Sequence, residues 1–146
     1  MKADTGIRVV IDTNVWISAL LTKTGAPALV TRQIIAAGCP VFSIPTFAEL
    51  ESRLWLPKFD RYLSMDDRKV FLHDLSGLAR WIELPAGIAA RTYCRDADDD
   101  KFIHTALAAQ APWLLTGDRD LLDVPVIPNL RILTPVEALQ LPEFRA

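Results

Sequence analysis

The fold of this chain is decided by residues 7–14, which read IRVVIDTN. The segment is a short apolar run that ends at an acid, Asp12, and only Arg8 interrupts it. Short, nearly continuous apolar runs with abrupt ends are typical of strands whose two faces are both covered. We therefore expect a buried strand over residues 7–12, with the Asp12 side chain at its carboxyl end.

The same kind of run recurs along the chain and alternates with helical patterns. The sequence TPVE at residues 134–137 is a well-formed helix start, with Thr as the N-cap, Pro first and Glu third. This strand–helix alternation predicts an α/β fold with a central, mostly parallel sheet of about five strands. Further strands are expected at 41–44, 81–84, 113–116 and 130–133, and helices at 26–37, 47–56, 66–78 and 101–110.

The composition fits one globular domain. The 146 residues are 51% hydrophobic and 23% charged, which suffices for one sizeable core. We expect this domain over residues 7–141, with flexible tails at 1–6 and 142–146. No apolar run reaches the roughly 18 residues needed to cross a bilayer. The N-terminus lacks an apolar signal core, so we expect a cytoplasmic protein without a membrane segment.

The net charge and the few cysteines and histidines restrict the kinds of site that this chain can form. Cys39, Cys94, His73 and His104 are too few and too scattered for a zinc site, and the cysteines are expected to be reduced. The net charge of −2 is not the basic footprint of a protein that binds nucleic acid mainly by neutralising phosphates. That argument weakens if some of the acids form a metal site, because bound cations would offset their charge.

Four acids are expected to meet at one edge of the sheet. Asp12 ends the first strand, Glu49 lies past the second, and Asp118 follows the fourth. Asp100 opens the helix that leads into the fourth strand. Sites in open parallel sheets lie at the carboxyl ends of strands. Clustered carboxylates repel one another unless divalent cations neutralise them, and oxygen ligands favour Mg²⁺ or Mn²⁺. The acids therefore indicate metal-assisted phosphoryl chemistry.

Each acid could also have a purely structural role. Asp12 could cap a helix that begins near Val15. Glu49 could be the third position of a capping box that starts at Thr46. The acids at 96–100 could form a solvated helix start, and Asp118 and Asp120 could belong to a simple turn.

Four stretches carry a family resemblance: VVIDTNVWIS at 9–18, EL at 49–50 with LWLPKF at 54–59, DADDDKFI at 96–103 and LTGDRDLL at 115–122. In this order and spacing they resemble the PIN domain family, and within it the toxins of toxin–antitoxin systems. The resemblance implies a three-layer α/β/α sandwich and Mg²⁺- or Mn²⁺-dependent cleavage of RNA. Water would attack the phosphorus in line and leave a 3′-hydroxyl and a 5′-phosphate.

The resemblance assigns metal-binding roles to Asp12, Glu49 and Asp118, and to one acid of the crowded run. We expect Asp100 to be that acid, because its distance along the chain to the next strand matches the family's helix-plus-strand spacing. Asp99 could take this metal-binding role in place of Asp100.

Further side chains would position the substrate. Asn14 and Thr116 are expected to orient the first acid and a phosphate or water through hydrogen bonds. Solvated surface is an equally ordinary role for the basic side chains nearby. The candidates for steering the RNA backbone are Arg119, Lys101, Arg53 and Lys58.

The resemblance also implies partners. Toxins of this family commonly form homodimers and are silenced by an antitoxin that occupies the acidic site. The segment WLPKF at residues 55–59 is the expected partner surface. Core packing is an equally good role for Leu54, Leu56 and Phe59.

Two other functions stay open. A PIN fold could bind RNA or a protein without cutting it, although the complete set of acids argues against this. A haloacid-dehalogenase-like phosphatase would share the acid at the end of the first strand. It would need a second acid at the position of Asn14, and one at Leu121 rather than at Asp120.

Overall fold

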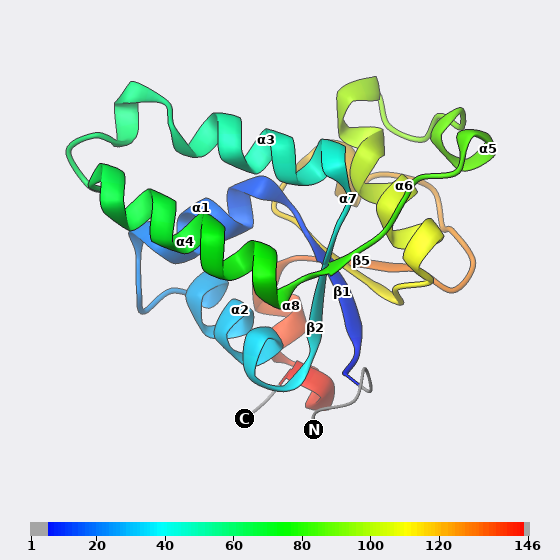
Figure 1. Cartoon of the computed structure of the whole chain (residues 1–146). Coiled ribbons are helices and arrows are strands. Elements are labelled where there is room, and N and C mark those ends of the chain that lie inside the picture. The colour runs from blue at the N-terminus through cyan, green and yellow to red at the C-terminus, as the bar shows by residue number, and fades with distance from the viewer. Residues whose placement is uncertain (1–5, 145–146) are drawn as a thin grey trace.

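The computed structural model describes residues 6–144 and contains a sheet of five parallel strands in the order β3-β2-β1-β4-β5 (Figure 1). From the central strand β1 the chain adds β2 and β3 on one side and β4 and β5 on the other. The predicted α/β class and parallel sheet are confirmed. The strands are β1 (Arg8–Ile11), β2 (Cys39–Phe42), β3 (Arg80–Trp81), β4 (Trp113–Leu115) and β5 (Arg131–Leu133).

Pro40 lies inside β2, which begins two residues before its predicted start. The N–H of Cys39 donates to the carbonyl of Ile7 at 2.9 Å, so the odd-numbered residues of β2 bond towards β1. The nitrogen of Pro40 points to the other side, where β3 begins only opposite Val41. A proline at this place removes no ladder bond, and it therefore does not end the strand. β3 is shorter than predicted because its neighbour β2 ends at Phe42.

Helices cover both faces of the sheet and make the three layers of an α/β/α sandwich (Figure 1). Val9 and Ile11 face a core built with α1, α2, α4 and α8, whereas Val10 and Leu114 face α6 and α7. This division follows from the pleat, which alternates side chains between the faces. The helices are α1 (Thr13–Leu21), α2 (Ala26–Ala37), α3 (Ile44–Leu54), α4 (Met65–Leu78), α5 (Ala86–Ala89), α6 (Asp100–Ala109), α7 (Arg119–Leu122) and α8 (Pro135–Leu139), with 3₁₀ turns at Pro57–Phe59, Ala97–Asp99 and Pro142–Phe144.

The helix starts show how well the local signals predict the fold. α2 occupies its predicted range, and α8 begins with the predicted capping box. The Thr134 hydroxyl accepts the N–H of Glu137, whose carboxylate accepts the N–H of Thr134. No helix within residues 6–144 combines the length and the apolar character needed to cross a membrane.

Both ends of the described chain belong to the packed domain. Phe144 is buried and packs edge-to-face against Trp113, with 5.3 Å between the ring centroids. A Cβ added to Gly6 would come within 2.7 Å of the backbone of Gly38, so these two segments are in close contact. Gly6 and Phe144, which fall within the predicted tails, therefore pack against the domain. Residues 1–5 and 145–146 of the predicted tails lie outside the described residues.

The segment predicted as a partner surface is only partly exposed. Leu54 is fully buried, and Trp55 and Phe59 pack against the same core. Leu56 is exposed at the tip of the α3–α4 hairpin, and Tyr62 is more exposed still. Core packing is therefore right for Leu54 and Phe59 but not for Leu56, and the exposed apolar surface extends from Leu56 to Tyr62.

Candidate functional site

Asp12 lies at the switch point of the sheet, where the chain order reverses between β1 and β4. It follows β1 directly and is only 4% exposed. Although Asp12 occupies the N-cap position of α1, its carboxylate makes no capping hydrogen bond. Its Oδ2 instead accepts a hydrogen bond from the Thr116 hydroxyl at 2.7 Å, at the end of β4. The side chain therefore faces the carboxyl edge and not the helix.

The surroundings of Asp12 disfavour the charged form of its carboxylate. Burial raises its pKa above the ordinary value, and the carboxylates of Glu49 and Asp118 raise it further. The hydrogen bond from Thr116 partly opposes these effects. An acid held in this way is stabilised in its charged form by any cation that reaches it.

Asp99 and Asp118 lie close enough to Asp12 to interact with it electrostatically, and Asp120 lies beside these two. A carboxylate oxygen from each of Asp99, Asp118 and Asp120 lies within 4.8 Å of the other two. The Thr116 hydroxyl accepts the N–H of Asp118 at 2.9 Å, and Asp118 Oδ1 accepts the N–H of Asp120 at 3.0 Å. We call Asp12, Asp99, Asp118 and Asp120 the acidic cluster. The GDRD stretch thus supplies two members of the cluster and not only a turn.

Asp99 is a partly exposed member of the acidic cluster, and its pKa is strongly raised. Burial raises its pKa, and the neighbouring charges of Asp118 and Asp96 bring it to about 7. No member of the acidic cluster forms an ion pair with a Lys or Arg within the described part of the chain. The cluster is therefore an uncompensated concentration of negative charge.

Asp100 does not take the place predicted for it. It is 2% exposed, and its Oδ1 accepts the N–H of Cys94 at 2.7 Å and the N–H of Tyr93 at 3.1 Å. These bonds tie the start of α6 to the preceding loop. In the structure Asp99 lies with Asp118 and Asp120, whereas Oδ1 of Asp100 faces the loop, so this geometry favours Asp99 for the place predicted for Asp100. Burial, together with Asp100, also raises the pKa of the Cys94 thiol, which stays protonated.

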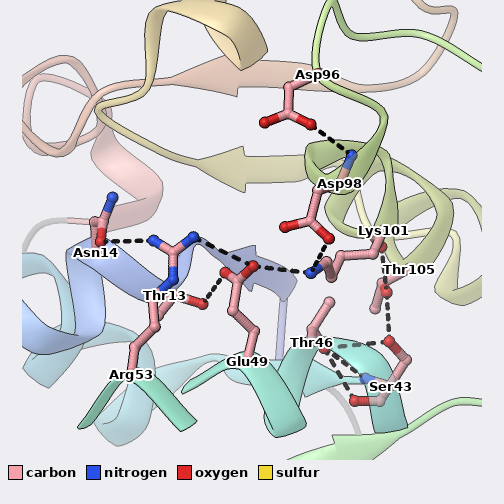
Figure 2. A network of polar contacts seen from close by, with 10 residues as sticks. All are labelled: Thr13, Asn14, Ser43, Thr46, Glu49, Arg53, Asp96, Asp98, Lys101 and Thr105. Carbon is pink, nitrogen blue, oxygen red and sulfur yellow. Dashed lines mark hydrogen bonds and ion pairs between the residues drawn. The ribbon is translucent and has the colours of Figure 1, made fainter. Parts of the chain in front are cut away.

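Glu49 is held by donors on both of its oxygens (Figure 2). Its Oε2 accepts the Thr13 hydroxyl at 2.6 Å, and its Oε1 lies 2.8 Å from Lys101 Nζ. Arg53 Nη2 approaches the same Oε1 at 3.6 Å. Glu49 is close enough to Asp12 to raise its pKa, but unlike the acidic cluster it is already neutralised.

The capping role considered for Glu49 is wrong, because α3 begins earlier than predicted. Its N-cap is Ser43, whose N–H donates to the Thr46 hydroxyl at 2.9 Å. Ser43 Oγ lies 2.7 Å from Thr105 Oγ1, and Thr105 donates to the carbonyl of Lys101 at 2.7 Å (Figure 2). Buried hydroxyls therefore join α3 and α6, the helices that carry Glu49 and Lys101.

Lys101 is an internal cation and not a free surface lysine. Its Nζ contacts Glu49 and lies 3.1 Å from Asp98 Oδ1, and its side chain is 17% exposed. Burial lowers the Lys101 pKa, but the hydrogen bonds and charges of Glu49 and Asp98 outweigh this, so the pKa is raised. Lys101 is therefore charged at neutral pH.

The other predicted RNA contacts differ in position. Arg53 borders the site, where its Nη1 donates to the Asn14 side chain at 3.4 Å. Asn14 is exposed, and its side chain has this partner rather than Asp12. Arg119 follows Asp118, is highly exposed and lies 3.5 Å from Asp123. Lys58 stands over the Phe59 ring on the hairpin, 5.2 Å from its centroid.

Several site residues were not identified from the sequence. Asp120 was open to interpretation as a turn, and nothing in the spacing marked Thr13, Ser43 or Thr105. Thr13 directly follows the strand-ending acid, which is a usable signal for a site residue. Ser43 directly follows β2 at the same edge, whereas the pairing with Thr105 depends on the packing of two distant helices.

Comparisons with known proteins identify the family of this chain. The family model described as "PIN domain" matches residues 8–120. An uncharacterised protein of Methanocaldococcus jannaschii is 33% identical over 119 residues, which cover 81% of this chain and 75% of that protein. The family-model match includes β1, α3 and the acidic cluster.

Solved structures with low sequence identity share the fold. A chain of VapBC2 from Rickettsia felis, bound to a DNA fragment from the promoter, aligns with a TM-score of 0.60 at 14% identity, covering 86% of this chain and 97% of that one. FitAcB from Neisseria gonorrhoeae gives 0.55 at 20% identity, covering 88% and 98%. VapC20 of Mycobacterium tuberculosis, described as a sarcin-ricin loop cleaving toxin, gives 0.50 at 15% identity, covering 77% and 91%.

Proposed function

Because the chain belongs to the PIN domain family, we propose that it is a nuclease that hydrolyses RNA phosphodiester bonds with Mg²⁺ or Mn²⁺. The observation that carries the proposal is the acidic cluster. Asp12, Asp99, Asp118 and Asp120 meet at the switch point of the sheet without a basic ion-pair partner among residues 6–144. Such a group is costly for the folded chain unless a cation is bound there.

The donor set fits a hard divalent ion. It consists of carboxylate oxygens alone, and the cysteine nearest the site is protonated. Mg²⁺ and Mn²⁺ prefer oxygen ligands of this kind. Asp12, Asp99 and Asp118 would hold the ion, and Asp120 would support it directly or through water. When bound, the ion would supply positive charge to polarise the phosphodiester and to stabilise the leaving oxygen.

The remaining residues would position the substrate. Thr116 fixes Asp12 and the Asp118 loop through one hydroxyl, which both donates and accepts. Arg53 lies beside Glu49 and the exposed Arg119 directly follows Asp118, and both would contact phosphates of the RNA backbone. Water would attack the phosphorus in line and leave a 3′-hydroxyl and a 5′-phosphate. No side-chain nucleophile is needed for this step.

We propose more specifically that this nuclease is the toxin of a toxin–antitoxin pair. The structural likeness to VapBC2, FitAcB and VapC20 supports a toxin that acts on RNA in the cytoplasm and is silenced by an antitoxin protein. A homodimer is expected, with the exposed apolar residues of the α3–α4 hairpin at its interface. Light scattering on the purified chain tests this state, and a monomer at micromolar concentration would refute it.

The activity is tested with purified protein and labelled single-stranded RNA. We expect cleavage with Mn²⁺, none in excess chelator, and a loss of about 100-fold or more for Asp12→Asn. Asp74→Asn is the matched control, because this exposed acid lies on α4 and outside the acidic cluster. Cleavage that survives chelator or Asp12→Asn contradicts the proposal. RNA binding without cleavage would indicate a binding module, and hydrolysis of a phosphomonoester would indicate a phosphatase.

A further inference from the structure

The acids at the carboxyl edge fall into two electrostatic classes. The acidic cluster has no ion pair with Lys or Arg in the described chain. Glu49 has two basic neighbours, Lys101 at 2.8 Å and Arg53 at 3.6 Å, and a hydroxyl donor in Thr13. The resemblance to PIN nucleases would treat Glu49 as a metal ligand like the others, but its surroundings are different.

We propose that Lys101 is a built-in cation that stands beside Glu49 in place of a second divalent ion, so that the chain binds a single Mg²⁺ or Mn²⁺. The single ion belongs to the acidic cluster. Glu49 then acts as an anchor for Lys101 and not as a metal ligand. This inference rests on the proposed nuclease function and narrows its metal requirement.

Lys101 is held in position from both ends. Its Nζ bonds Glu49 on α3 and Asp98 in the preceding 3₁₀ turn. Its backbone carbonyl accepts the hydroxyl of Thr105, which meets Ser43 at the start of α3. A lysine on a free surface loses side-chain entropy when it contacts a substrate, but Lys101 has already lost it in the fold.

An ion at Glu49 would have to displace donors from both carboxylate oxygens. Oε1 is within hydrogen-bond distance of Lys101, and Oε2 accepts the 2.6 Å bond from Thr13. A divalent ion beside the ammonium group of Lys101 would also meet direct repulsion at low dielectric. The acidic cluster presents neither obstacle, so an ion favours the cluster.

Lys101 can also reach a substrate. An ammonium group has three N–H donors, and Glu49 and Asp98 occupy two of them. The third donor has no partner among residues 6–144, and the side chain keeps 17% exposure at this edge. It is suited to a non-bridging oxygen of the RNA phosphate, where a second ion would otherwise supply positive charge.

Counting bound ions tests the inference without an activity assay. The probe is Mn²⁺ alone, titrated into the metal-free chain at neutral pH, with the free ion measured by electron paramagnetic resonance. We expect one ion per wild-type chain, and a second ion for Lys101→Met, because Glu49 and Asp98 are then released. Lys101→Arg keeps the charge and should return the count to one. Lys69→Met, an exposed lysine on α4, is the matched control and should also bind one.

Glu49→Gln provides a second variant in case Lys101→Met does not fold. If Glu49 is not a metal ligand, Glu49→Gln keeps the single ion with nearly unchanged affinity, whereas Asp99→Asn weakens it by about tenfold or more. Two ions in the wild type, one ion in folded Lys101→Met, or loss of the ion in Glu49→Gln would each overturn the inference while RNA cleavage persists. A chain that binds no Mn²⁺ and cleaves no RNA overturns the proposed function as well.

Discussion

Asp99 and Asp100 are adjacent carboxylates, and the structure gives them opposite roles. Asp99 faces the acidic cluster, whereas Asp100 accepts the backbone N–H groups of Tyr93 and Cys94. We predict that Asp99→Asn lowers RNA cleavage by about 100-fold or more without loss of stability at neutral pH. Asp100→Asn should lower the free energy of unfolding by about 1–3 kcal/mol, because it weakens buried charge-assisted hydrogen bonds, and should retain more cleavage.

Thermal melts and RNA cleavage on both variants separate the two roles. Asp74→Asn is the control for charge alone, since Asp74 is exposed on α4 and is not part of the acidic cluster or of the Lys101 contacts. If Asp100→Asn abolished cleavage at full stability while Asp99→Asn remained active, the assignment of these two residues would be reversed.

The sequence could place the third acid only to within one residue. Adjacent residues on a helix differ in direction by about 100°, so the spacing along the chain does not decide which side chain faces a site. The positions of Asp12 and Asp118 are easier to predict, because each residue follows the end of a strand and therefore lies at the edge of the sheet. The choice between a capping role and a site role for Glu49 depended on where α3 begins. The helix begins at Ile44, three residues before the predicted start.

At the scale of elements, the α3–α4 hairpin is held by a buried arginine. Arg68 is 2% exposed, its Nη2 donates to the carbonyl of Leu63 at 3.0 Å, and its guanidinium lies 5.3 Å from the Trp55 ring. We predict that Arg68→Ala lowers the free energy of unfolding by about 2–4 kcal/mol, because packing and hydrogen bonds are lost together. Chemical denaturation measures this change.

The control for Arg68 is its ion-pair partner. Asp60 is highly exposed and lies 3.0 Å from Arg68 Nη2, so Asp60→Asn should cost less than about 1 kcal/mol. Equal losses for the two variants would mean that the ion pair, and not the burial of Arg68, holds the hairpin.

The hairpin also shows where element prediction from sequence fails. Apolar periodicity found α2 and α4 almost to the residue, because each buries one face against a single layer. The segment at 55–59 has no such period, and its aromatic residues could equally cover a core or a partner. Trp55 is held inside by Arg68, which lies in another helix, so no local pattern contains that information.

For the whole molecule, strand–helix alternation predicted a parallel sheet but not the order of its strands. The switch between β1 and β4 brings Asp12 together with Asp118 from a distant part of the chain. Lys101 forms its ion pairs with Glu49 and Asp98 and not with Asp12 or Asp118. The net charge of −2 is therefore distributed unevenly, and the stability of the whole domain should depend on pH and on bound cations.

The direction of this dependence follows from Asp99. Its pKa is about 7 in the folded chain against an ordinary value of 3.8, so the folded state binds the proton more tightly than the unfolded state. Between about pH 4 and pH 7 the unfolded chain ionises first, and the contribution of this group to stability falls as pH rises and stays low above that range. Burial raises the pKa of Asp12 as well, which acts in the same direction.

We therefore predict that, in chelator, the melting temperature of the wild type relative to Asp99→Asn falls as pH rises from about 5 to about 8. Mn²⁺ should raise the wild-type melting temperature more at the upper pH, because the ion binds the ionised carboxylates of the folded state. Calorimetry of both proteins, in chelator and in Mn²⁺, at both pH values measures the eight melting temperatures. A stabilisation by Mn²⁺ that is equal at both pH values, or equal in Asp99→Asn, would show that the ion binds elsewhere than the acidic cluster.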